Sequence, residues 1–424
     1  MDAPPRPAAA RVGATRAGAV RAGRGGPRAS AVRRASSVAH LWVGLALGGV
    51  LVVLSVTGSA LVFRAEIDRA LNPGLLRVEP GPERAPLGSA LAGVHEAEPR
   101  LVRLPRTDEA PHEVWLGDGR RAYVDPYSGA VLGVRGDDEG AVNVLFAVHA
   151  ELLGGETGEA AVGVIGLLTV LVAGTGLVLW WPAAPTVRRV RRRLAVAWRG
   201  GRWRLNYDLH RAGGAYTAAF LVLVAATGSA LVFYAEAGAL LHAATRSAPP
   251  PPPPTASGGP LAPDVLDGAL AAAQRALPDG EPTFVTLPQS PDAPLTVRLR
   301  TPGEWHPNGR SYVHLEPATG RVLRADDARA ASPAARALYA AYPLHVGAVG
   351  GGAVRALYAV LGLAPAVLSV TGVLVWYRRW RRRDRAVRGG PARADRPARS
   401  ARPARRAGTA GRGGPVARPT PPAP

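Results

Sequence analysis

The sequence predicts an α-helical membrane protein that has four transmembrane helices in a duplicated, two-plus-two arrangement and two small extracytoplasmic α+β domains. Three observations predict this fold class: four apolar segments of membrane-spanning length, an uneven distribution of arginine, and an internal repeat. The chain has 424 residues, 47% of them hydrophobic, and a formal net charge of +21. That composition fits one ordinary soluble domain poorly.

The four apolar segments comprise residues 41–63, 162–181, 213–234 and 354–377. A helix needs about 20 residues to cross the hydrocarbon core, and hydrocarbon satisfies no backbone polar group, so we expect each segment to be a helix. The first segment follows two arginines, as in a signal peptide. Its length exceeds the apolar region of a signal peptide, about 7 to 15 residues, so we expect an uncleaved first span.

The 52 basic residues are all arginine, and they gather in residues 1–39, 183–209 and 378–424. By the positive-inside rule, both termini and the middle loop are cytoplasmic, and the protein lies in the cytoplasmic membrane. The two stretches between them face outward. Because the arginine runs adjoin the spans and lack interleaved aromatic residues, we expect a lipid bilayer and no nucleic acid as the partner.

The repeat is clearest in the heptapeptide "TGSALVF", which occurs at residues 57–63 and 227–233. His40 and His210 each lie 17 residues before the threonine of that heptapeptide. A second pair, His149 and His345, each lies 26 residues before a later Thr-Gly step. Twenty-six helical residues reach about 39 Å, more than the hydrocarbon thickness, so we expect His149 and His345 on short helices or at a bend above the membrane.

Each outward stretch contains a similar soluble segment. The sequences "RRAYVDPYSGAVLGV" and "RSYVHLEPATGRVLR" alternate with period two around a Pro-x-(Ser/Thr)-Gly turn, which predicts a hairpin in each. Helix-like sequences precede both, "APLGSALAGVHEAE" and "APDVLDGALAAAQRAL". We therefore predict one small α+β domain in each half, the second of them following a polyproline spacer.

These elements divide the chain into nine parts. They are a disordered cytoplasmic tail (1–35), the first transmembrane helix (36–64), the first extracytoplasmic domain (65–140), the His149 segment with the second helix (141–182), the arginine-rich cytoplasmic loop (183–209), the third helix (210–235), the proline-rich linker with the second extracytoplasmic domain (236–335), the His345 segment with the fourth helix (336–380), and a second disordered cytoplasmic tail (381–424).

The hairpins resemble PepSY domains, and their alternation with four spans resembles the PepSY-associated transmembrane family, which includes iron-regulated membrane proteins and ferrisiderophore reductases. The resemblance covers about residues 36–383. The family's histidine-led segments, followed by a glycine-containing helix and a later Thr-Gly, match His40, His210, His149 and His345. In one departure, the first copy reads "AHLW" where the copy at His210 reads "LHRA", so the arginine after the histidine is lost.

The resemblance implies one or two haem b groups, with a quinol or a cytoplasmic reductase as electron donor and a ferric siderophore as substrate. The residues agree with histidine ligation, because cysteine is absent and the initiator is the one methionine. Pairing equivalent positions gives an inner pair, His40 and His210, on the cytoplasmic side. It also gives an outer pair, His149 and His345. Two such sites at different depths would form an electron path across the bilayer.

Small residues accompany the inner pair. Gly44 lies one helical turn after His40, and Gly214 lies one turn after His210. Glycine there leaves room for a macrocycle beside its ligand, or it allows close helix packing. A lone histidine at a helix end has a simpler interpretation too, as a neutral, hydrogen-bonded interfacial ring.

A second function is compatible with the sequence: a non-enzymatic, membrane-anchored module whose PepSY-like domains bind an extracytoplasmic protein or peptide. No nucleophile motif or dinucleotide-binding fingerprint occurs. The remaining five histidines lack metal-ligand spacing. They are His95, His112, His242, His306 and His314. The segment "EWHPNGRSYVH" could hold a cation, but we expect a solvated loop.

Overall fold

The computed structural model describes residues 27–388. Four of its helices are long and apolar enough to cross a membrane: Ser30–Leu61, Gly155–Trp180, Arg202–Val232 and Gly351–Arg385. Each contains most of one predicted apolar segment, so the prediction of four spanning helices is confirmed by length and composition. The outer parts of both predicted disordered tails, residues 1–26 and 389–424, lie outside the described residues.

The inner parts of those predicted tails are helical, so the prediction of disorder is wrong there. Helix α1 (Pro27–Leu61) begins eight residues before residue 35, and α14 (Ala364–Arg388) continues past residue 381. Continuing an established helix adds one hydrogen bond for each residue that is ordered, which favours such extensions. Residues 377–388 belong to a second unit of the chain, in which the Tyr377 ring stacks on Trp380 at 6.0 Å.

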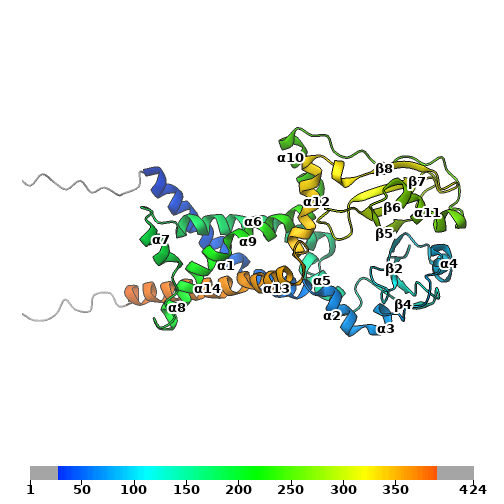
Figure 1. Cartoon of the computed structure of the whole chain (residues 1–424). Helices are drawn as coiled ribbons and strands as arrows, with labels where there is room; N and C mark the ends of the chain where they lie inside the picture. The colour runs from blue at the N-terminus through cyan, green and yellow to red at the C-terminus, as the bar shows by residue number, and fades with distance from the viewer. Residues whose placement is uncertain (1–26, 389–424) are drawn as a thin grey trace, which may run out of the picture. The chain divides into compact units, whose positions relative to one another are not determined.

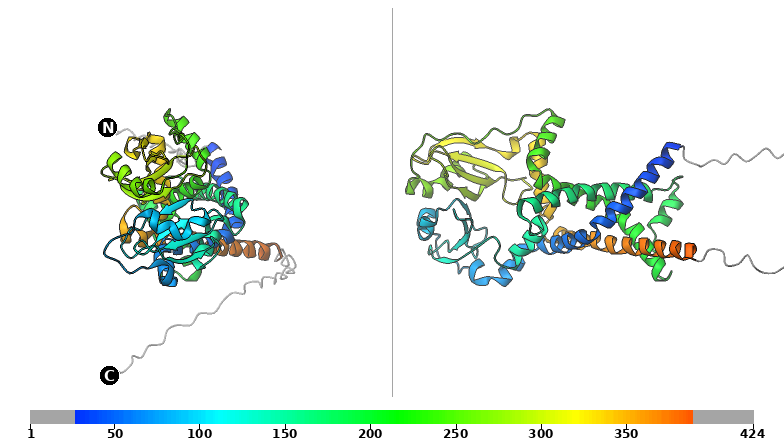
Figure 2. Two further views of the ribbon diagram at one scale, coloured as in Figure 1. Left: turned by 90° about the vertical axis from the view of Figure 1, so that its right-hand side faces the viewer. Right: turned by 180° about the vertical axis from the view of Figure 1, so that it is seen from behind.

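The third span is assembled from α8 (Arg202–Asp208), the π-helical turn η2 (Leu209–Gly213) and α9 (Gly214–Val232). The fourth contains α13 (Gly351–Gly362) and α14, separated at Leu363. The second span is α6 (Gly155–Trp180), which runs side by side with α9 and also packs against α1 (Figures 1 and 2).

His149 and His345 lie on short helices that precede the second and fourth spans, as expected. These helices are α5 (Ala141–Glu151) and α12 (Pro333–Val346). Left-handed residues end both: Leu152 after α5, with φ of 49°, and Gly347 after α12, with φ of 72°. Each short helix therefore turns sharply into the span that follows it.

The extracytoplasmic strands form one antiparallel sheet of eight strands. The strands are β1 (Leu101–Arg103), β2 (His112–Trp115), β3 (Arg121–Val124), β4 (Val131–Arg135), β5 (Glu281–Thr286), β6 (Leu295–Arg300), β7 (Ser311–Leu315) and β8 (Val322–Asp326). Their order is β4-β3-β2-β1-β5-β6-β7-β8. The two predicted hairpins are β3–β4 and β7–β8, so both are confirmed.

The two sets of four strands are joined where β1 pairs with β5, with Leu101 opposite Thr286 and Arg103 opposite Phe284. The predicted helices also form, as α4 (Leu87–Leu91) with the 3-10 turn η1 (Ala92–Ala97), and as α11 (Pro263–Ala276). Their apolar residues share one hydrophobic cluster with strands from both halves. The two expected α+β domains are thus continuous through one sheet and one core.

A buried ion pair ties the first half of the sheet to the chain that leaves α1. Helix α2 (Arg64–Leu71) carries Asp68, and Arg135 at the end of β4 lies 2.5 Å from it. The Arg135 Nε also donates to the Tyr123 hydroxyl at 2.6 Å. Burial raises the pKa of Asp68, but the Arg135 guanidinium more than offsets this and holds that pKa below its usual value. In the second half, α10 (Tyr234–Thr245) packs against α12.

Candidate functional site

The structure brings the four predicted histidines together in the two predicted pairs. The rings of the inner pair, His40 on α1 and His210 on η2, have their centroids 6.1 Å apart with planes at 74°. The rings of the outer pair, His149 on α5 and His345 on α12, have theirs 6.3 Å apart with planes at 43°. Each pair takes one histidine from each half of the chain.

Each inner histidine rests on the Thr-Gly step of a neighbouring span. The Nδ1 atom of His40 lies 3.0 Å from the carbonyl oxygen of Val172 and 3.4 Å from the hydroxyl of Thr175 on α6. The ring lies so close to Gly176 that a Cβ there would be 3.0 Å from the His40 Cε1. A side chain at residue 176 would therefore press on the imidazole.

His210 has the equivalent contacts with α14. Its Nδ1 lies 3.0 Å from the carbonyl oxygen of Leu368 and 3.2 Å from the hydroxyl of Thr371, and a Cβ at Gly372 would be 3.0 Å from its Cε1. The same hydroxyl-and-carbonyl pair thus receives both inner rings.

The outer histidines rest on the two copies of the repeated heptapeptide. His149 Nδ1 lies 3.0 Å from the Thr57 hydroxyl, and a Cβ at Gly58 would be 2.6 Å from the His149 Cε1. His345 Nδ1 lies 2.9 Å from the Val224 carbonyl oxygen and 3.4 Å from the Thr227 hydroxyl. A Cβ at Gly228 would be 2.8 Å from the His345 Cε1. The heptapeptide therefore begins with a seat for a histidine from another helix.

These contacts fix the tautomer of the imidazoles. A carbonyl oxygen only accepts, and each of the four threonines donates its own hydroxyl hydrogen to the carbonyl four residues earlier, at 2.7 to 2.8 Å. The proton must therefore reside on Nδ1, and the lone pair on Nε2. A histidine that ligates a metal through one nitrogen and donates from the other to a carbonyl has this arrangement.

The ring separations fit a metal held between two imidazoles. Bonds of about 2.0 to 2.1 Å to opposite sides of one metal place the two ring centroids about 6.4 Å apart, which both pairs match. Among residues 27–388 no group of three or more His, Asp or Glu side chains could hold a metal ion. Two protein ligands suit a haem, whose macrocycle supplies the other four, better than they suit a zinc ion.

Space beside the inner pair also fits a macrocycle. A Cβ at Gly44 would meet nothing within 4 Å, and at Gly214 it would be 3.7 Å from the Leu368 side chain. Gly44 therefore does not serve close helix packing in this structure. The space at Gly44 favours the interpretation that glycine leaves room next to His40.

The arginine that distinguishes the second copy braces the loop before His210. Arg211 pairs with the buried Asp208 at 2.9 Å and donates to the Ala195 carbonyl at 3.0 Å. In the first copy the corresponding residues are Val38 and Leu41, so this pair has no counterpart. Its position explains why the arginine can be absent after His40 without loss of the histidine.

The C-terminal end of α6 lies close to the inner pair and is covered by arginine. Arg33 of α1 donates to the carbonyl oxygens of Val178 and Leu179 at 3.1 and 2.6 Å. Arg193 donates to the Leu179 carbonyl as well, at 3.2 Å. These guanidinium groups satisfy carbonyls that have no partner within the helix and complement its dipole.

The Thr-Gly steps are the part of the site that the sequence prediction did not assign. They are Thr57-Gly58, Thr175-Gly176, Thr227-Gly228 and Thr371-Gly372. The signal was present, since there is one such step in each span and one candidate histidine for each step. Their role depends on contacts between helices that are 92 to 161 residues apart in sequence.

The other histidines do not join the two pairs. The segment expected to be a solvated loop is partly buried, which corrects that expectation: His306 and His314 are only 6% and 5% exposed. His306 stacks on Tyr342 with ring centroids 5.1 Å apart, and His314 Nε2 lies 3.2 Å from Asp326. Burial lowers the pKa of His306 to about 3, together with neighbouring arginines.

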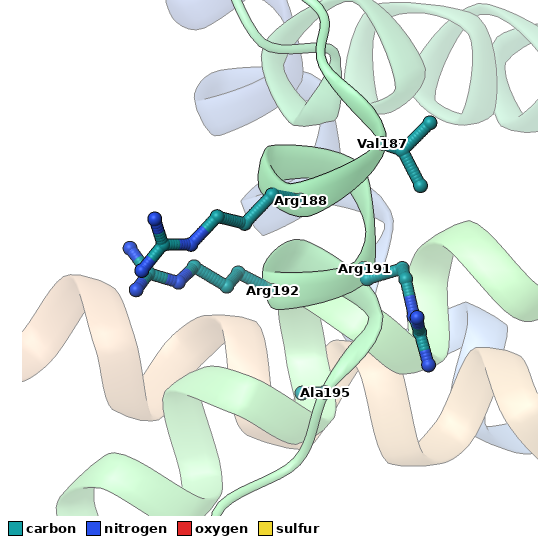
Figure 3. Close-up of a pocket in the computed structure, with 5 residues that line it drawn as sticks. All are labelled: Val187, Arg188, Arg191, Arg192 and Ala195. Atoms are coloured by element: carbon teal, nitrogen blue, oxygen red, sulfur yellow. The ribbon is translucent and has the colours of Figure 1, made fainter.

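A hollow beside α7 (Val187–Leu194) is separate from the histidines. It is lined by Val187, Arg188, Arg191, Arg192 and Ala195 (Figure 3). Arg188 and Arg192 extend to the same side of the helix, whereas Arg191 extends to another. Three guanidinium groups with no acid in the lining suit the phosphates of anionic lipid headgroups rather than catalysis.

Comparison with known proteins adds one match. The model of the family described as "PepSY-associated TM region" matches residues 38–379, which include all four histidines and all four Thr-Gly steps. No curated protein matches the chain.

Proposed function

Since the chain belongs to the PepSY-associated TM family, a family of membrane-spanning proteins, we propose that it is a haem b-containing membrane oxidoreductase. It passes electrons across the cytoplasmic membrane to ferric iron in a siderophore or a similar extracytoplasmic acceptor. The observation that supports this proposal best is the pairing of His40 with His210 and of His149 with His345. All four rings are oriented with Nε2 as the basic nitrogen.

The two pairs would hold one haem each. A haem b between two imidazoles supplies one-electron transfer, because its iron cycles between the ferric and ferrous states. His40 and Gly58, which seats His149, are 18 residues apart on α1, or about 27 Å at 1.5 Å per residue. That separation is close to the hydrocarbon thickness of about 30 Å, so the two sites serve opposite sides of the bilayer.

The seats prepare the histidines for that role. Each Thr-Gly step holds a ring by hydrogen bonds to Nδ1 and by contact with the glycine, so the ring plane and the direction of Nε2 are fixed in advance. Such outer contacts orient metal ligands and raise their basicity. The neutral imidazoles carry no net charge into the low-dielectric bundle, so they avoid the cost of a buried charge.

The arrangement also supports a duplicated origin and a defined orientation. Each half provides a span with a leading histidine, four strands, a short helix with a second histidine, and another span. With the termini and α7 on the cytoplasmic side, the arginines of α7 meet anionic headgroups there, and the sheet lies outside. His40 and His210 then face the electron donor.

The donor and the acceptor follow from chemistry. The sequence has no dinucleotide-binding fingerprint, so a quinol or a separate cytoplasmic reductase supplies the electron. One electron converts one ferric ion to ferrous. Ferrous iron binds hard oxygen chelators much more weakly than ferric iron, so the reduction releases the metal from a siderophore.

An absorbance spectrum tests the proposal. Detergent-solubilised protein from haem-replete cells should show a Soret band and, after dithionite reduction, an α-band, with two extractable b haems per chain. A colourless preparation would contradict the proposal. It would favour a non-enzymatic, membrane-anchored module whose sheet binds an extracytoplasmic protein or peptide.

A further inference from the structure

An arginine and tyrosine cluster lies on the face of the sheet opposite the hydrophobic core. On β6, Val297 and Leu299 point into the core, so Arg298 between them lies on the other face. Arg310 precedes β7, and buried His306 lies in the loop that connects the two strands. This cluster, Arg298, His306 and Arg310, is bordered by tyrosines of α10 and α12.

Aromatic rings surround the two guanidinium groups. The Arg310 Cζ lies 5.6 Å from the ring centre of Tyr339 and 6.0 Å from that of Tyr234. The Arg298 Cζ lies 5.6 Å from the ring centre of Phe284 and 5.8 Å from that of Tyr312. These contacts hold the guanidinium groups in place without neutralising their charge.

The positive charge of the cluster is not balanced by ion pairs. Within the described chain, neither Arg298 nor Arg310 forms a salt bridge, and the Arg310 Nε is buried without a hydrogen-bond partner. Arg298 donates to the Gly309 carbonyl oxygen at 2.8 Å and to His306 Nδ1 at 3.1 Å. A partly buried guanidinium without an anion is costly, which points to a ligand that supplies one.

The nearest carboxylate is already engaged. Glu304 accepts from the hydroxyls of Thr301 and Ser311, at 2.6 and 2.7 Å, and from the backbone N–H of Arg310 at 2.5 Å. A further arginine, the exposed Arg106 from the loop after β1, reaches the carbonyl of Pro307 and the side chain of Asn308. The cluster therefore keeps a net positive charge.

His306 adds a neutral donor to the cluster. Its Nδ1 accepts from the backbone N–H of Asn308 at 3.1 Å, so the ring proton resides on Nε2. Burial and the charges of Arg298, Arg310 and Arg106 lower its pKa to about 3, so the ring stays neutral at ordinary pH.

The cluster is directly connected to the outer histidine pair. His306 stacks on Tyr342, with ring centroids 5.1 Å apart and planes at 27°. Tyr342 precedes His345 by three residues on α12, which is about 4.5 Å along the helix axis. A molecule bound to Arg298 and Arg310 would thus lie next to the electron exit of the proposed function.

We propose that this cluster binds the extracytoplasmic substrate and selects for a negatively charged, carboxylate-bearing ferric chelate. Planar guanidinium groups pair with carboxylates through two parallel hydrogen bonds, and the tyrosines provide flat contact surfaces for the chelator. This inference rests on the proposed function for its redox meaning, but binding itself requires no electron transfer.

Titration calorimetry on the full-length protein in detergent tests the inference. Gallium(III) citrate, a redox-inert stand-in for ferric citrate, should bind to the wild type. Arg310→Gln and Arg298→Gln should each weaken that binding about tenfold or more, because each removes a charged hydrogen-bond donor. Arg275→Gln is the charge-matched control, since Arg275 is exposed on α11, which covers the opposite face of the sheet, and affinity should stay within about twofold.

Arg106→Gln is a second variant in case a buried arginine is needed for folding, because Arg106 is exposed. It should weaken binding about threefold through lost long-range attraction. A neutral ferric trihydroxamate should bind about tenfold more weakly than gallium citrate. The inference is overturned if gallium citrate does not bind the wild type, if Arg310→Gln and Arg106→Gln leave its affinity unchanged, or if the neutral chelate binds equally well.

The two proposals fail separately. A colourless protein that binds gallium citrate through Arg298 and Arg310 would contradict haem-based electron transfer but not the binding site. A protein with two haems whose citrate affinity does not depend on these arginines would contradict the binding site alone.

Discussion

The inner and outer histidine pairs hold their rings in the same way but on different supports. In both, a Thr-Gly step receives the imidazole, and the centroids lie 6.1 and 6.3 Å apart. The inner histidines lie on helices that themselves cross the membrane, whereas His149 and His345 lie on the short helices α5 and α12. Position within the long spans is therefore not what places a histidine, and the Thr-Gly seat is the common element.

The outer pair differs in two further respects. Its glycines lie closer to the rings, because a Cβ at Gly58 or Gly228 would be 2.6 or 2.8 Å from the imidazole carbon, against 3.0 Å at both inner seats. Its helix α12 also reaches the sheet, through the stacking of Tyr342 on His306. The outer pair is thus the one that a ligand on the sheet could influence.

The largest expected effect comes from removing one histidine. His210→Ala should abolish the inner site and leave the outer one, so that haem per chain falls to about half, as measured by the pyridine haemochrome spectrum. His95→Ala, a change at an exposed histidine of η1, should retain all haem. Loss of all or of none in His210→Ala would show that the pairs are not independent sites.

The next effect distinguishes the seats. Gly58→Ala places a methyl group against His149, whereas Gly49→Ala, on the same helix, meets nothing within 4 Å. We expect Gly58→Ala to lower outer haem content about tenfold or more in affinity, because outer contacts of a metal ligand have effects of that size. Gly176→Ala should have a smaller effect on the inner site, with Gly174→Ala as its control. Equal haem retention in Gly58→Ala and Gly49→Ala would exclude the seat.

The smallest effect concerns the brace that only the second half possesses. Arg211→Leu reproduces the residue found after His40, and it leaves Asp208 with the more distant Arg204 at 3.5 Å. We expect both haems to remain and the stability of the solubilised protein to fall by about 1 to 2 kcal/mol. A thermal melt measures this. Loss of the inner haem would instead give Arg211 a direct part in the site.

The sequence was sufficient to predict the spans and the histidine pairs, because hydropathy and the equal spacings of a repeat survive in one dimension. His40 and His210 could be paired because each lies 17 residues before the same heptapeptide. The partner of each histidine could not be predicted, since His149 contacts Thr57 and His40 contacts Thr175. These contacts depend on how helices from distant parts of the chain pack.

The union of the two predicted domains was also beyond the sequence. Strand β1 has three residues, too few for an alternating pattern, and its partner β5 lies about 180 residues later. Edge pairing of this kind is set by the shared hydrophobic core rather than by local signals. For the same reason His306 was expected in a solvated loop, although helix α12 covers it through Tyr342.

Electron paramagnetic resonance of the oxidised protein tests the central claim most directly, namely that imidazoles from opposite halves of the chain clasp one haem iron in each pair. The account predicts two low-spin ferric signals. The more anisotropic one comes from the inner pair, because ring planes at 74° split the iron d orbitals less than planes at 43°. That signal should vanish in His210→Ala. High-spin iron in the wild type, or both low-spin signals persisting in His210→Ala, would contradict the account.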